Sequence, residues 1–398
     1  MRHPAEPHGS GRIHASEMRR RNGALLLELI RREGPVSRAD LARRSGLTKP
    51  TVSSQMAALL RRGVVVEQGP GDSKARGGKR PTLVGFNADY GRLVGVEIGA
   101  SRVRIELTDL NGAVLGRLTL AIHPERGAGR ILEVIAKGIA KVLENGPRRK
   151  PTVVGIAAAG RVDAGQGVVL EAGNVFNWHD VAVREYLEKA LRLQVVVDND
   201  VNLAALGEMH GGVARGLRNF VLIRLTTGIG AGVVLDGKLW QGSHWAAGEI
   251  GHILLDRAEM NGGWDPRGYL ESLVASDKLM ERARAASSSL AELIGAQDLP
   301  QALREAVRLE DPAAGEILDN LARHLGMATV QVAAAFDPEM IILQGELFDL
   351  VIDRIRRIVE RAVPWPVRIE SSTLGDDAVL LGAISVARGA ANELLARP

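Results

Sequence analysis

A group of polar residues follows the apolar segment 195–197, which has the composition of a buried strand. Asn199, Asp200 and Asn202 come directly after it. Because sites in α/β proteins assemble at strand ends, a carboxylate here is well placed to accept a proton from a hydroxyl group. The alternative is structural, since Asn199 or Asp200 is also a typical N-cap of a following helix. The residues alone leave both interpretations open.

A second polar pair is spaced around a flexible turn. Residues 248–252 read Gly-Glu-Ile-Gly-His and offer the carboxylate of Glu249 and the imidazole of His252. Both groups form hydrogen bonds with hydroxyls, so the pair suits a sugar ligand. A lone histidine is more often structural, and the spacing alone does not separate the two interpretations.

A glycine-rich turn separates two apolar segments. Residues 226–232 read Thr-Thr-Gly-Ile-Gly-Ala-Gly, with Thr227, Gly228 and Gly230 at the centre. Such a turn can present backbone N–H groups to an anion such as a phosphate. On this pattern alone we favour the alternative, a tight hairpin that needs glycine for its φ angles.

The segments that must position these residues alternate between strand and helix patterns from residue 92 onward. The patterns predict three strands over 92–122 with an Asn-Gly turn at 111–112, a helix over 128–144, a strand over 153–160, a helix over 183–192, a strand over 195–200, a helix after it, a hairpin over 219–240, largely helical structure over 275–330, a strand over 340–345 and a closing helix over 380–396. Such alternation indicates an α/β fold.

The first eighty-five residues have a different pattern. Residues 16–33 look like an amphipathic helix whose buried stripe is Leu25, Leu26, Leu29 and Ile30. This helix is predicted to end at Gly34-Pro35, and shorter helices follow it.

Capping residues divide the next thirty residues into two helices. Ser37, with Asp40 three residues later, opens the first, and Gly46 closes it. Thr48 caps the second, which ends at Gly63. Two short helices joined by a glycine turn form a helix-turn-helix, and its later helix enters the DNA major groove by the N-terminal end.

Candidate DNA contacts lie on these helices and on a predicted two-stranded wing, formed by residues 64–66 and 83–84 with its tip at 69–81. Small, polar or basic side chains off the apolar stripe suit base edges and phosphates. The candidates are Ser37, Arg38, Lys49, Thr51, Ser53, Ser54, Arg76, Lys79 and Arg80. For any one of Lys49, Thr51 or Ser54, a phosphate contact is as good an interpretation as a base contact.

The charge distribution agrees with an anionic partner for this segment. Residues 1–80 hold 17 Lys and Arg against 7 Asp and Glu, a net charge of +10, whereas the rest of the chain has a net charge of −6. The chain has no cysteine, which excludes disulfides and thiolate metal sites and favours the cytoplasm. We expect no membrane association, because no uncharged apolar run reaches spanning length and the N-terminus lacks the apolar centre of a signal peptide.

These pieces, in this order, resemble the ROK family of repressors, open reading frames and sugar kinases. The resemblance extends from about Glu17 to the C-terminus and is carried by SRADLARRSGLTKPTVSSQMAALLRRGVV, GKRPTLVGFN, VDNDVNLAALGE, LTTGIGAGVVLDGKLWQG, GEIGH, RGYLE and LGDDAVLLGA. It implies an α/β chain with an N-terminal winged helix-turn-helix followed by a two-lobed actin-like ATPase and sugar-kinase (ribonuclease H-like) domain. The N-terminal module marks the repressor branch.

The resemblance also implies the domain boundaries. They are a tail over 1–15, which we expect to be disordered, a winged helix-turn-helix over 16–88 and the sugar-kinase-like effector domain over 91–398, with lobe one over about 91–203 plus 378–398 and lobe two over about 204–377.

The family's sugar contacts carry over to six polar positions of this sequence. They are Asn174, Asn199, Asp200, Glu249, His252 and Glu271. Asp200 sits where the kinases of the family keep their catalytic base. Six hydrogen-bonding side chains suit a monosaccharide effector, since a site that bonds every hydroxyl rejects analogues strongly.

Departures from the family's pattern argue against kinase chemistry. The loop that binds the phosphates of ATP in the kinases corresponds here to residues 97–102. Glu97 stands where the kinases have a shorter aspartate, and Ala100, after Gly99, carries a Cβ where they have a second glycine. A late Gly-Gly turn appears here as Gln344-Gly345. Phosphoryl transfer depends on positioning, so we expect vestigial phosphate loops, no catalytic residue and no bound ATP.

The zinc site of many family members is also altered. Its three cysteines correspond here to Gly262, Trp264 and Tyr269. His252 alone cannot hold a structural zinc ion, which takes four ligands, so we expect no metal. We expect the loop to be ordered by packing of Trp264 and Tyr269 instead.

The sequence therefore predicts a sugar-responsive repressor that binds a palindromic operator in double-stranded DNA as a homodimer or homotetramer. A sugar kinase that also binds DNA is one alternative, supported by Asp200 and the glycine-rich turn. A regulator whose effector domain serves only for oligomerisation or protein docking is the other.

Overall fold

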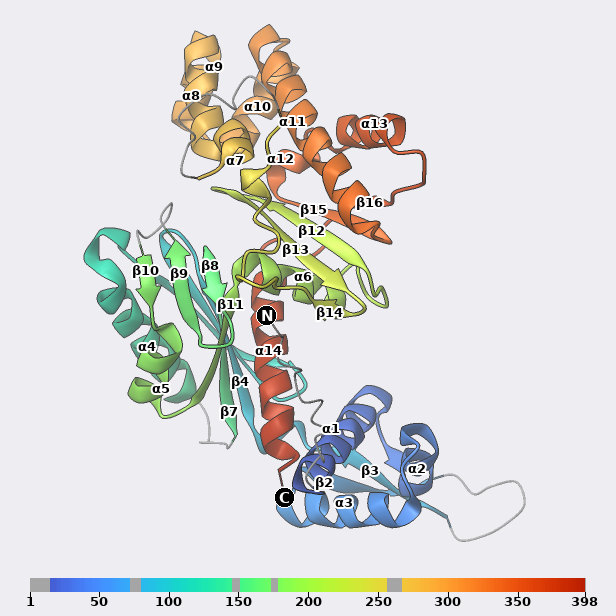
Figure 1. Ribbon diagram of the computed structural model, residues 1–398. Coiled ribbons are helices and arrows are strands. Elements are labelled where there is room, and N and C mark those ends of the chain that lie inside the picture. The colour runs from blue at the N-terminus through green and yellow to red at the C-terminus, as the bar shows by residue number, and fades with distance from the viewer. Residues whose placement is uncertain (1–14, 72–79, 145–150, 173–177, 256–266, 398) are drawn as a thin grey trace, which may run out of the picture.

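The computed structural model describes residues 15–71, 80–144, 151–172, 178–255 and 267–397. An N-terminal module lies at one end of the molecule, beside the first of two lobes, and the second lobe lies at the other end (Figure 1). The predicted architecture, a winged helix-turn-helix followed by a two-lobed α/β domain, is confirmed.

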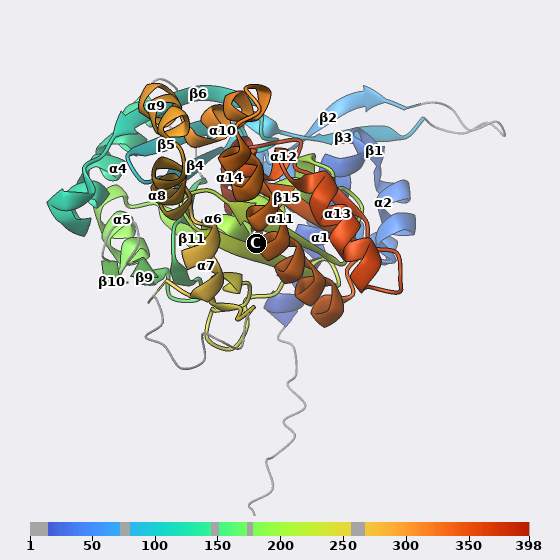
Figure 2. The same cartoon turned by 90° about the horizontal axis from the view of Figure 1, so that it is seen from above.

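The N-terminal module consists of helices packed on a small antiparallel sheet of order β1-β3-β2. Its elements are α1 (Ala15–Glu33), β1 (Val36–Ser37), α2 (Arg38–Ser45), α3 (Lys49–Arg62), β2 (Val65–Pro70) and β3 (Thr82–Phe86). β2 and β3 project away from the rest of the molecule as the predicted wing (Figure 2). The strand β1, which pairs with β3, was not predicted.

The helix caps of the module are those that the sequence predicts. The side-chain oxygen of Ser37 accepts a hydrogen bond from the backbone N–H of Asp40, and that of Thr48 accepts one from Thr51. Gly46 and Gly63 adopt left-handed conformations that end α2 and α3. Each local signal therefore determines where one helix begins or ends.

The buried face of α1 differs by one position from the predicted stripe. Leu25 is 42% exposed, whereas Leu27 is completely buried together with Leu26 and Ile30. The prediction for Leu25 was wrong because three consecutive leucines fit more than one helical face, and the helix turns the second and third inward.

The described residues of the first lobe form a five-stranded sheet of order β11-β7-β4-β5-β6. Its elements are β4 (Arg92–Ile98), β5 (Arg102–Thr108), β6 (Val114–Ala121), α4 (Gly127–Glu144), β7 (Thr152–Ala158), α5 (Val183–Leu191) and β11 (Gln194–Asn199), with 3-10 turns at Ala88–Tyr90 and Pro124–Arg126. β4, β5 and β6 form the predicted meander, whereas β7 and β11 run parallel to β4. α4 and α5 cover one face of the sheet.

A small antiparallel sheet extends this lobe, in the order β10-β9-β8. Its strands are β8 (Arg161–Asp163), β9 (Val168–Ala172) and β10 (Trp178–Val181). These strands were not predicted, because each is short and interrupted by glycine or polar residues.

The second lobe has its own five-stranded sheet within the described residues, of order β14-β13-β12-β15-β16. Its strands are β12 (Phe220–Leu225), β13 (Ile229–Leu235), β14 (Lys238–Leu239), β15 (Met340–Gln344) and β16 (Ile369–Ser371). Helices cover one face (Figure 1): α7 (Tyr269–Val274), α8 (Ser276–Ala286), α9 (Ser288–Ala296), α10 (Leu299–Arg308), α11 (Pro312–Phe336), α12 (Glu346–Asp349) and α13 (Ile352–Ala362). A large apolar core lies between this sheet and the helices.

Two helices, α6 (Asp200–Gly211) and α14 (Asp377–Leu395), pack together at the junction of the lobes. α14 lies on β4 and β7 of the first lobe, and α6 lies on β12 and β13 of the second. Glycines make this packing very close, since a Cβ built at Gly382 would lie 1.8 Å from the carbonyl oxygen of Leu203. A Cβ at Gly155 would lie 2.0 Å from the carbonyl oxygen of Ala383. The two helices therefore approach backbone to backbone.

α14 is long and apolar enough to cross a membrane by length and composition, and half of it is buried. Its buried side packs against α6 and the first lobe. Its apolar character is therefore accounted for by its position at the centre of the protein.

The C-terminal end of α14 joins the N-terminal module to the body (Figure 1). One apolar core contains residues of the module, such as Leu26 and Val84, together with Ala391 and Leu395 of α14. Arg62, the last residue of α3, donates a hydrogen bond to the carbonyl oxygen of Leu395 across 2.8 Å. The module is therefore fixed to the helix that also joins the two lobes.

Candidate functional site

The polar residues after β11 lie at the junction of the lobes, at the N-terminus of α6. The side-chain oxygen of Asn199 caps α6 by accepting the N–H groups of Val201 and Asn202, and its amide donates to the carbonyl oxygen of Gly160 across 2.7 Å. The structural alternative for Asn199 is thus confirmed. Asn199 still lies at the site, but most of its hydrogen-bonding capacity serves the fold.

The carboxylate of Asp200 faces a buried arginine of the second lobe. Nη1 of Arg224, on β12, lies 2.8 Å from Oδ2 of Asp200. Nη2 of the same guanidinium lies 3.8 Å from Glu97 and 3.5 Å from Asp376. Burial raises the pKa of Asp200, and the charge of Arg224 opposes this rise. One buried cation from the second lobe is therefore shared by Glu97 on β4, Asp200 at the start of α6 and Asp376, the residue before α14.

A second arginine completes this network on the side of the first lobe. Nε of Arg104, on β5, donates to Glu97 across 2.5 Å, and its Nη1 lies 3.2 Å from Asp377. Burial raises the pKa of Glu97, while the hydrogen bond from Arg104 lowers it in part. We call these residues the Arg224 cluster: Glu97, Arg104, Asp200, Arg224, Asp376 and Asp377.

Glu249 is the residue before the short 3-10 helix Ile250–His252, beside β13, and His252 is the last residue of that helix. Both residues remain exposed to solvent, yet the surrounding protein desolvates the carboxyl of Glu249 and raises its pKa. The neighbouring charges that act on this carboxyl include those of His252, Arg161 and Asp200. The charges of His252 and Asp200 therefore both act on the carboxyl of Glu249, and a shared sugar site stays a prediction.

Glu271, on α7, lies against the glycine-rich turn. Its side chain is buried, and Oε2 accepts a hydrogen bond from the backbone N–H of Ile229 across 3.1 Å. A Cβ built at Gly228 would lie 2.8 Å from the same oxygen. Glu271 therefore sits beside the strand turn that leads from Arg224 into β13.

The glycine-rich turn is a hairpin between β12 and β13, but its glycines are not there for their φ angles. Gly228, Gly230 and Gly232 are not among the described glycines with positive φ. They leave room for neighbours instead, because a Cβ at Gly232 would lie 2.8 Å from the carbonyl oxygen of Val201 on α6. The predicted reason for these glycines was wrong, since close packing and not backbone conformation requires them. Thr227 is exposed at the tip of the turn.

The other candidate phosphate loop is also engaged internally. Gly99 lies in the turn between β4 and β5, where its N–H donates to the carbonyl oxygen of Arg102 across 2.9 Å. The side chain of Gln344 is buried and donates to the carbonyl oxygen of Gly375. Beside these segments, the arginines of the Arg224 cluster pair with Glu97, Asp200 and Asp376.

Several predicted residues lie outside the described part of the chain. They are Asn174, Arg76, Lys79, Gly262 and Trp264. Among the described residues, no group of three or more His, Asp or Glu side chains could hold a metal ion. The chain contains no cysteine.

The N-terminal module presents the predicted polar residues of α3 on one side of the molecule. Lys49, Ser53 and Ser54 are exposed, and Thr51 is half-buried with its hydroxyl 2.9 Å from that of Thr48. Arg38 at the start of α2 and Arg80, two residues before β3 at the outer end of the wing, are also exposed. The exposed side chains among them are accessible to a DNA duplex, and Arg38 also lies 3.9 Å from Glu67.

Ser37 is a correction to the predicted DNA contacts. It is 4% exposed, and its hydroxyl is hydrogen-bonded to Asp40 across 2.7 Å. Because this hydroxyl caps α2 inside the module, it is not available to a phosphate.

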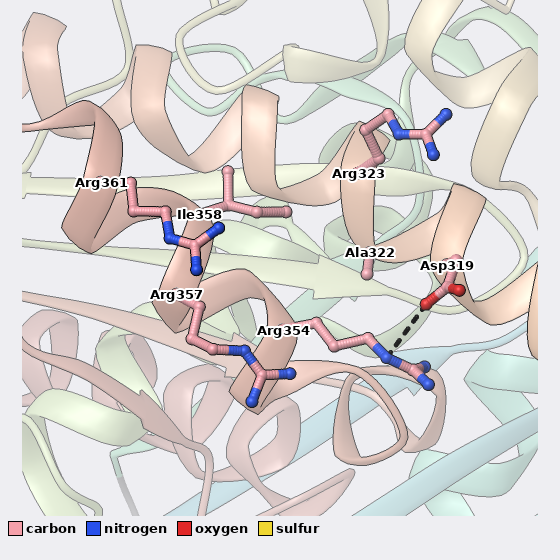
Figure 3. Close-up of a pocket in the computed structure, with 7 residues that line it drawn as sticks. All are labelled: Asp319, Ala322, Arg323, Arg354, Arg357, Ile358 and Arg361. Atoms are coloured by element: carbon pink, nitrogen blue, oxygen red, sulfur yellow. Dashed lines mark ion pairs between the residues drawn. The ribbon is translucent and has the colours of Figure 1, made fainter.

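A surface hollow lies apart from this site, between α11 and α13 (Figure 3). Its volume is about 370 Å³, and it is lined by Asp319, Ala322, Arg323, Arg354, Arg357, Ile358 and Arg361. Arg354 points toward Asp319, and their side chains are 3.2 Å apart. This basic lining contains none of the predicted sugar contacts.

Arg224 is the important residue that sequence reasoning missed. Its strand, Phe-Val-Leu-Ile-Arg-Leu, is otherwise apolar, and all six residues are buried. A lone charge inside a buried strand must find a counter-ion, so this position carried a usable signal. Its partners are distant in sequence, and the pairing itself could not be read from the chain.

Comparison with known proteins agrees with this architecture. Residues 93–390 match the ROK family, and residues 18–75 match the MarR family. The xylose repressor of Bacillus spizizenii is 29% identical over 92% of this chain and 94% of its own length. A crystal structure of a ROK family transcriptional regulator, a homologue of the E. coli MLC protein, has a TM-score of 0.79 at 25% identity and covers 95% of this chain and 98% of its own.

An enzyme of the same family resembles only the body of the chain. A ROK family glucokinase from Streptomyces griseus, solved with glucose and AMPPNP, is 30% identical with a TM-score of 0.64. It matches 75% of this chain and 100% of its own. The chain belongs to the ROK family and carries, in addition, a MarR-type winged helix-turn-helix at its N-terminus.

Proposed function

We propose that the protein is a sugar-responsive transcriptional repressor that binds operator DNA through its N-terminal module. The observation that carries this proposal is that the candidate sugar site and the DNA-binding module both contact one helix. α14 bears the Arg224 cluster at one end and the winged helix-turn-helix at the other. The likeness to a xylose repressor over nearly the whole of both chains supports it.

The proposed effector is a monosaccharide held at the junction of the lobes. Asp200, Glu249, His252 and Glu271 provide carboxylates and an imidazole there, which are suitable partners for hydroxyl groups. Asn174 and Asn199 are proposed to complete the site. The glucose in the related glucokinase structure supports a sugar as the ligand class.

We propose that the protein has no kinase activity and needs neither ATP nor zinc. In a kinase, an aspartate at position 200 would have to accept a proton from the sugar hydroxyl, and a cation hydrogen-bonded to this carboxylate occupies an oxygen that would accept that proton. Arg224 is such a cation, at 2.8 Å. Glu97 is likewise paired with Arg104.

We further propose that it works in the cytoplasm as a homodimer or a homotetramer. A regulator must reach the chromosome, and a palindromic operator is matched by a two-fold arrangement of winged modules. Arg38, Lys49, Thr51, Ser53, Ser54, Arg76, Lys79 and Arg80 are the proposed DNA contacts. The oligomeric state is measured by light scattering with and without operator DNA.

A thermal-shift screen of the purified protein tests the ligand. The panel contains D-xylose, D-glucose, their phosphates and ATP. A ligand that binds only the folded protein raises its melting temperature by an amount that grows with the ratio of ligand concentration to dissociation constant. We expect a rise with a neutral monosaccharide and none with ATP. A rise with ATP, together with sugar-dependent ATP hydrolysis, would identify a kinase and overturn the proposal.

A further inference from the structure

We propose that the Arg224 cluster and helix α14 form the link through which a sugar at Asp200 changes the placement of α3. This inference rests on the proposed function and names the route by which the two sites communicate. It assigns a role to Arg104, Arg224, Asp376 and Asp377, which are not among the proposed DNA or sugar contacts. The route has three steps, each of which depends on a different set of contacts.

The first step lies at Arg224, which is positioned to respond to its neighbours. The side chain is 7% exposed, and its guanidinium is divided among Asp200, Glu97 and Asp376. Nε has no hydrogen-bond partner among the described residues. A hydroxyl that bonds to Asp200 competes with Nη1 for the same carboxylate. The guanidinium of Arg224 then moves toward Glu97 and Asp376, because a buried positive charge must stay paired with carboxylates.

The second step lies at the start of α14. The N-cap residue Asp376 makes no side-chain hydrogen bond to the helix that it precedes. Arginines hold this end instead: Nη2 of Arg104 donates to the carbonyl oxygen of Asp376 across 2.5 Å, and its Nη1 is 3.2 Å from Asp377. Arg224 approaches Asp376 from the other lobe at 3.5 Å. Contacts from both lobes therefore set the position of the first turn.

The third step is transmission along a stiff element. α14 has 19 residues, about 28 Å of helix, and its backbone is packed directly on its neighbours at Gly155 and Gly382. At the far end, Asn392 accepts a hydrogen bond from Arg31 of α1 across 2.8 Å. The carbonyl oxygens of Leu395 and Arg397 accept hydrogen bonds from Arg62 of α3. A displacement of α14 is therefore delivered to the helix that is proposed to enter the major groove.

The test removes the ionic contacts at the start of α14 and leaves the sugar residues intact. The variant is the double substitution Asp376→Asn/Asp377→Asn, whose two side chains are 60% and 73% exposed and thus tolerant of change. The control is Asp353→Asn, which removes an exposed Asp–Arg pair from the first turn of α13. Both changes neutralise aspartates at a helix N-terminus, so they alter the helix dipole interaction in the same way.

The readout is the ratio of DNA dissociation constants with and without sugar. The probe is a duplex selected from a random library by the wild-type protein, titrated with and without D-xylose or D-glucose. Coupling between two sites typically changes affinity by about 5–150-fold. We expect wild type and Asp353→Asn to show such a ratio, and the double variant to fall below about twofold while its sugar affinity without DNA stays within about twofold of wild type. A double variant with the wild-type ratio would overturn the link.

A second measurement separates failure of the link from failure of the proposed function. If neither sugar binds the wild-type protein, the proposed ligand is wrong. The link between the two ends of α14 is then tested in the absence of sugar, by amide hydrogen exchange. The double variant is expected to exchange faster both at residues 377–380 and at residues 59–63 of α3. Faster exchange confined to residues 377–380 would show that α14 does not connect the two ends, and would overturn the inference.

Discussion

Arg224 and Asp200 form a buried ion pair, 2.8 Å between Nη1 and Oδ2, that joins β12 of the second lobe to the first turn of α6. The pair therefore places a positive charge directly against the carboxylate that we propose as a sugar contact. The same pair also brings Glu97 and Asp376 into one network.

Replacement of Asp200 by asparagine is predicted to weaken sugar binding. Hydrogen bonds to charged groups contribute about 1.5–3 kcal/mol, so the loss corresponds to roughly 10–100-fold in the dissociation constant. Isothermal titration with the sugar found in the thermal-shift screen measures this loss. Asp353→Asn should bind with wild-type affinity.

Wild type and Asp200→Asn together also test the absence of kinase activity. Neither wild type nor Asp200→Asn is predicted to hydrolyse ATP in the presence of sugar, because Arg224 occupies the carboxylate. Turnover by the wild type that disappears in Asp200→Asn would contradict this account and establish an enzyme.

Sugar affinity is predicted to fall as the pH is lowered from 7 toward 5. Burial raises the pKa of Glu249 and Asp200, so in the free protein these carboxyls take up protons at a higher pH than ordinary Glu and Asp do. A protonated carboxyl has lost part of its capacity to accept hydroxyl hydrogen bonds, so protons compete with the sugar. Titration at several pH values measures the effect.

Glu249→Gln isolates the contribution of the Glu249 carboxyl to the pH dependence of sugar affinity. It should bind sugar more weakly at pH 7 and show a smaller decrease with falling pH, because one of the two titrating groups is gone. An unchanged pH profile in Glu249→Gln would mean that this carboxyl does not contact the sugar.

Local signals in the sequence were sufficient for much of the fold. Ser37, Gly46, Thr48 and Gly63 determine helix ends through hydrogen bonds within a few residues, and such caps can be read directly. The strands of the meander and of the hairpin were likewise marked by apolar runs between turns. Leu25 was misplaced because the choice between adjacent leucines depends on packing against the rest of the module.

The connections of the candidate site could be predicted only in part. The sequence indicated Asp200, Glu249 and His252 as polar groups at strand ends and turns. It did not indicate that Arg224 pairs with Asp200, Glu97 and Asp376, because these partners lie 24, 127 and 152 positions away and are brought together by the lobe packing. Likewise, the close packing that requires glycine in the turn 226–232 could not be predicted, because it depends on the position of α6.

Gly382→Ala is predicted to destabilise the junction of the lobes. The new Cβ would lie 1.8 Å from the carbonyl oxygen of Leu203, so α6 and α14 would have to separate. Overpacking of this kind costs about 1–3 kcal/mol or more. Chemical unfolding measures the loss.

Gly389→Ala is the matched control in the same helix. Nothing lies within 4 Å of a Cβ built at this position, so the substitution should stabilise the helix by about 0.5–1 kcal/mol. Equal effects of the two substitutions would show that the close approach at Gly382 is unimportant.

Lys49→Ala is predicted to weaken DNA binding by removing a phosphate contact. Lys49 is exposed at the first residue of α3, the end that enters the groove. The loss of one phosphate contact lowers the slope of log K against log salt by about 1 and weakens binding to all sequences alike. Anisotropy titrations at several salt concentrations measure the slope.

Lys278→Ala provides the control for this measurement, because it removes a lysine from α8 in the second lobe. It should leave the slope unchanged. If Lys49→Ala instead altered the preference among sequences at a constant slope, Lys49 would contact a base and not a phosphate.

We expect one molecule to bind both sugar and DNA, and each ligand to change the affinity for the other. The most direct measurement is the affinity of the wild-type protein for its selected duplex, by fluorescence anisotropy, with and without a saturating monosaccharide. We expect the sugar to weaken DNA binding at least about fivefold, and DNA to weaken sugar binding by the same factor. Equal DNA affinities in the presence and absence of a sugar that demonstrably binds would contradict it.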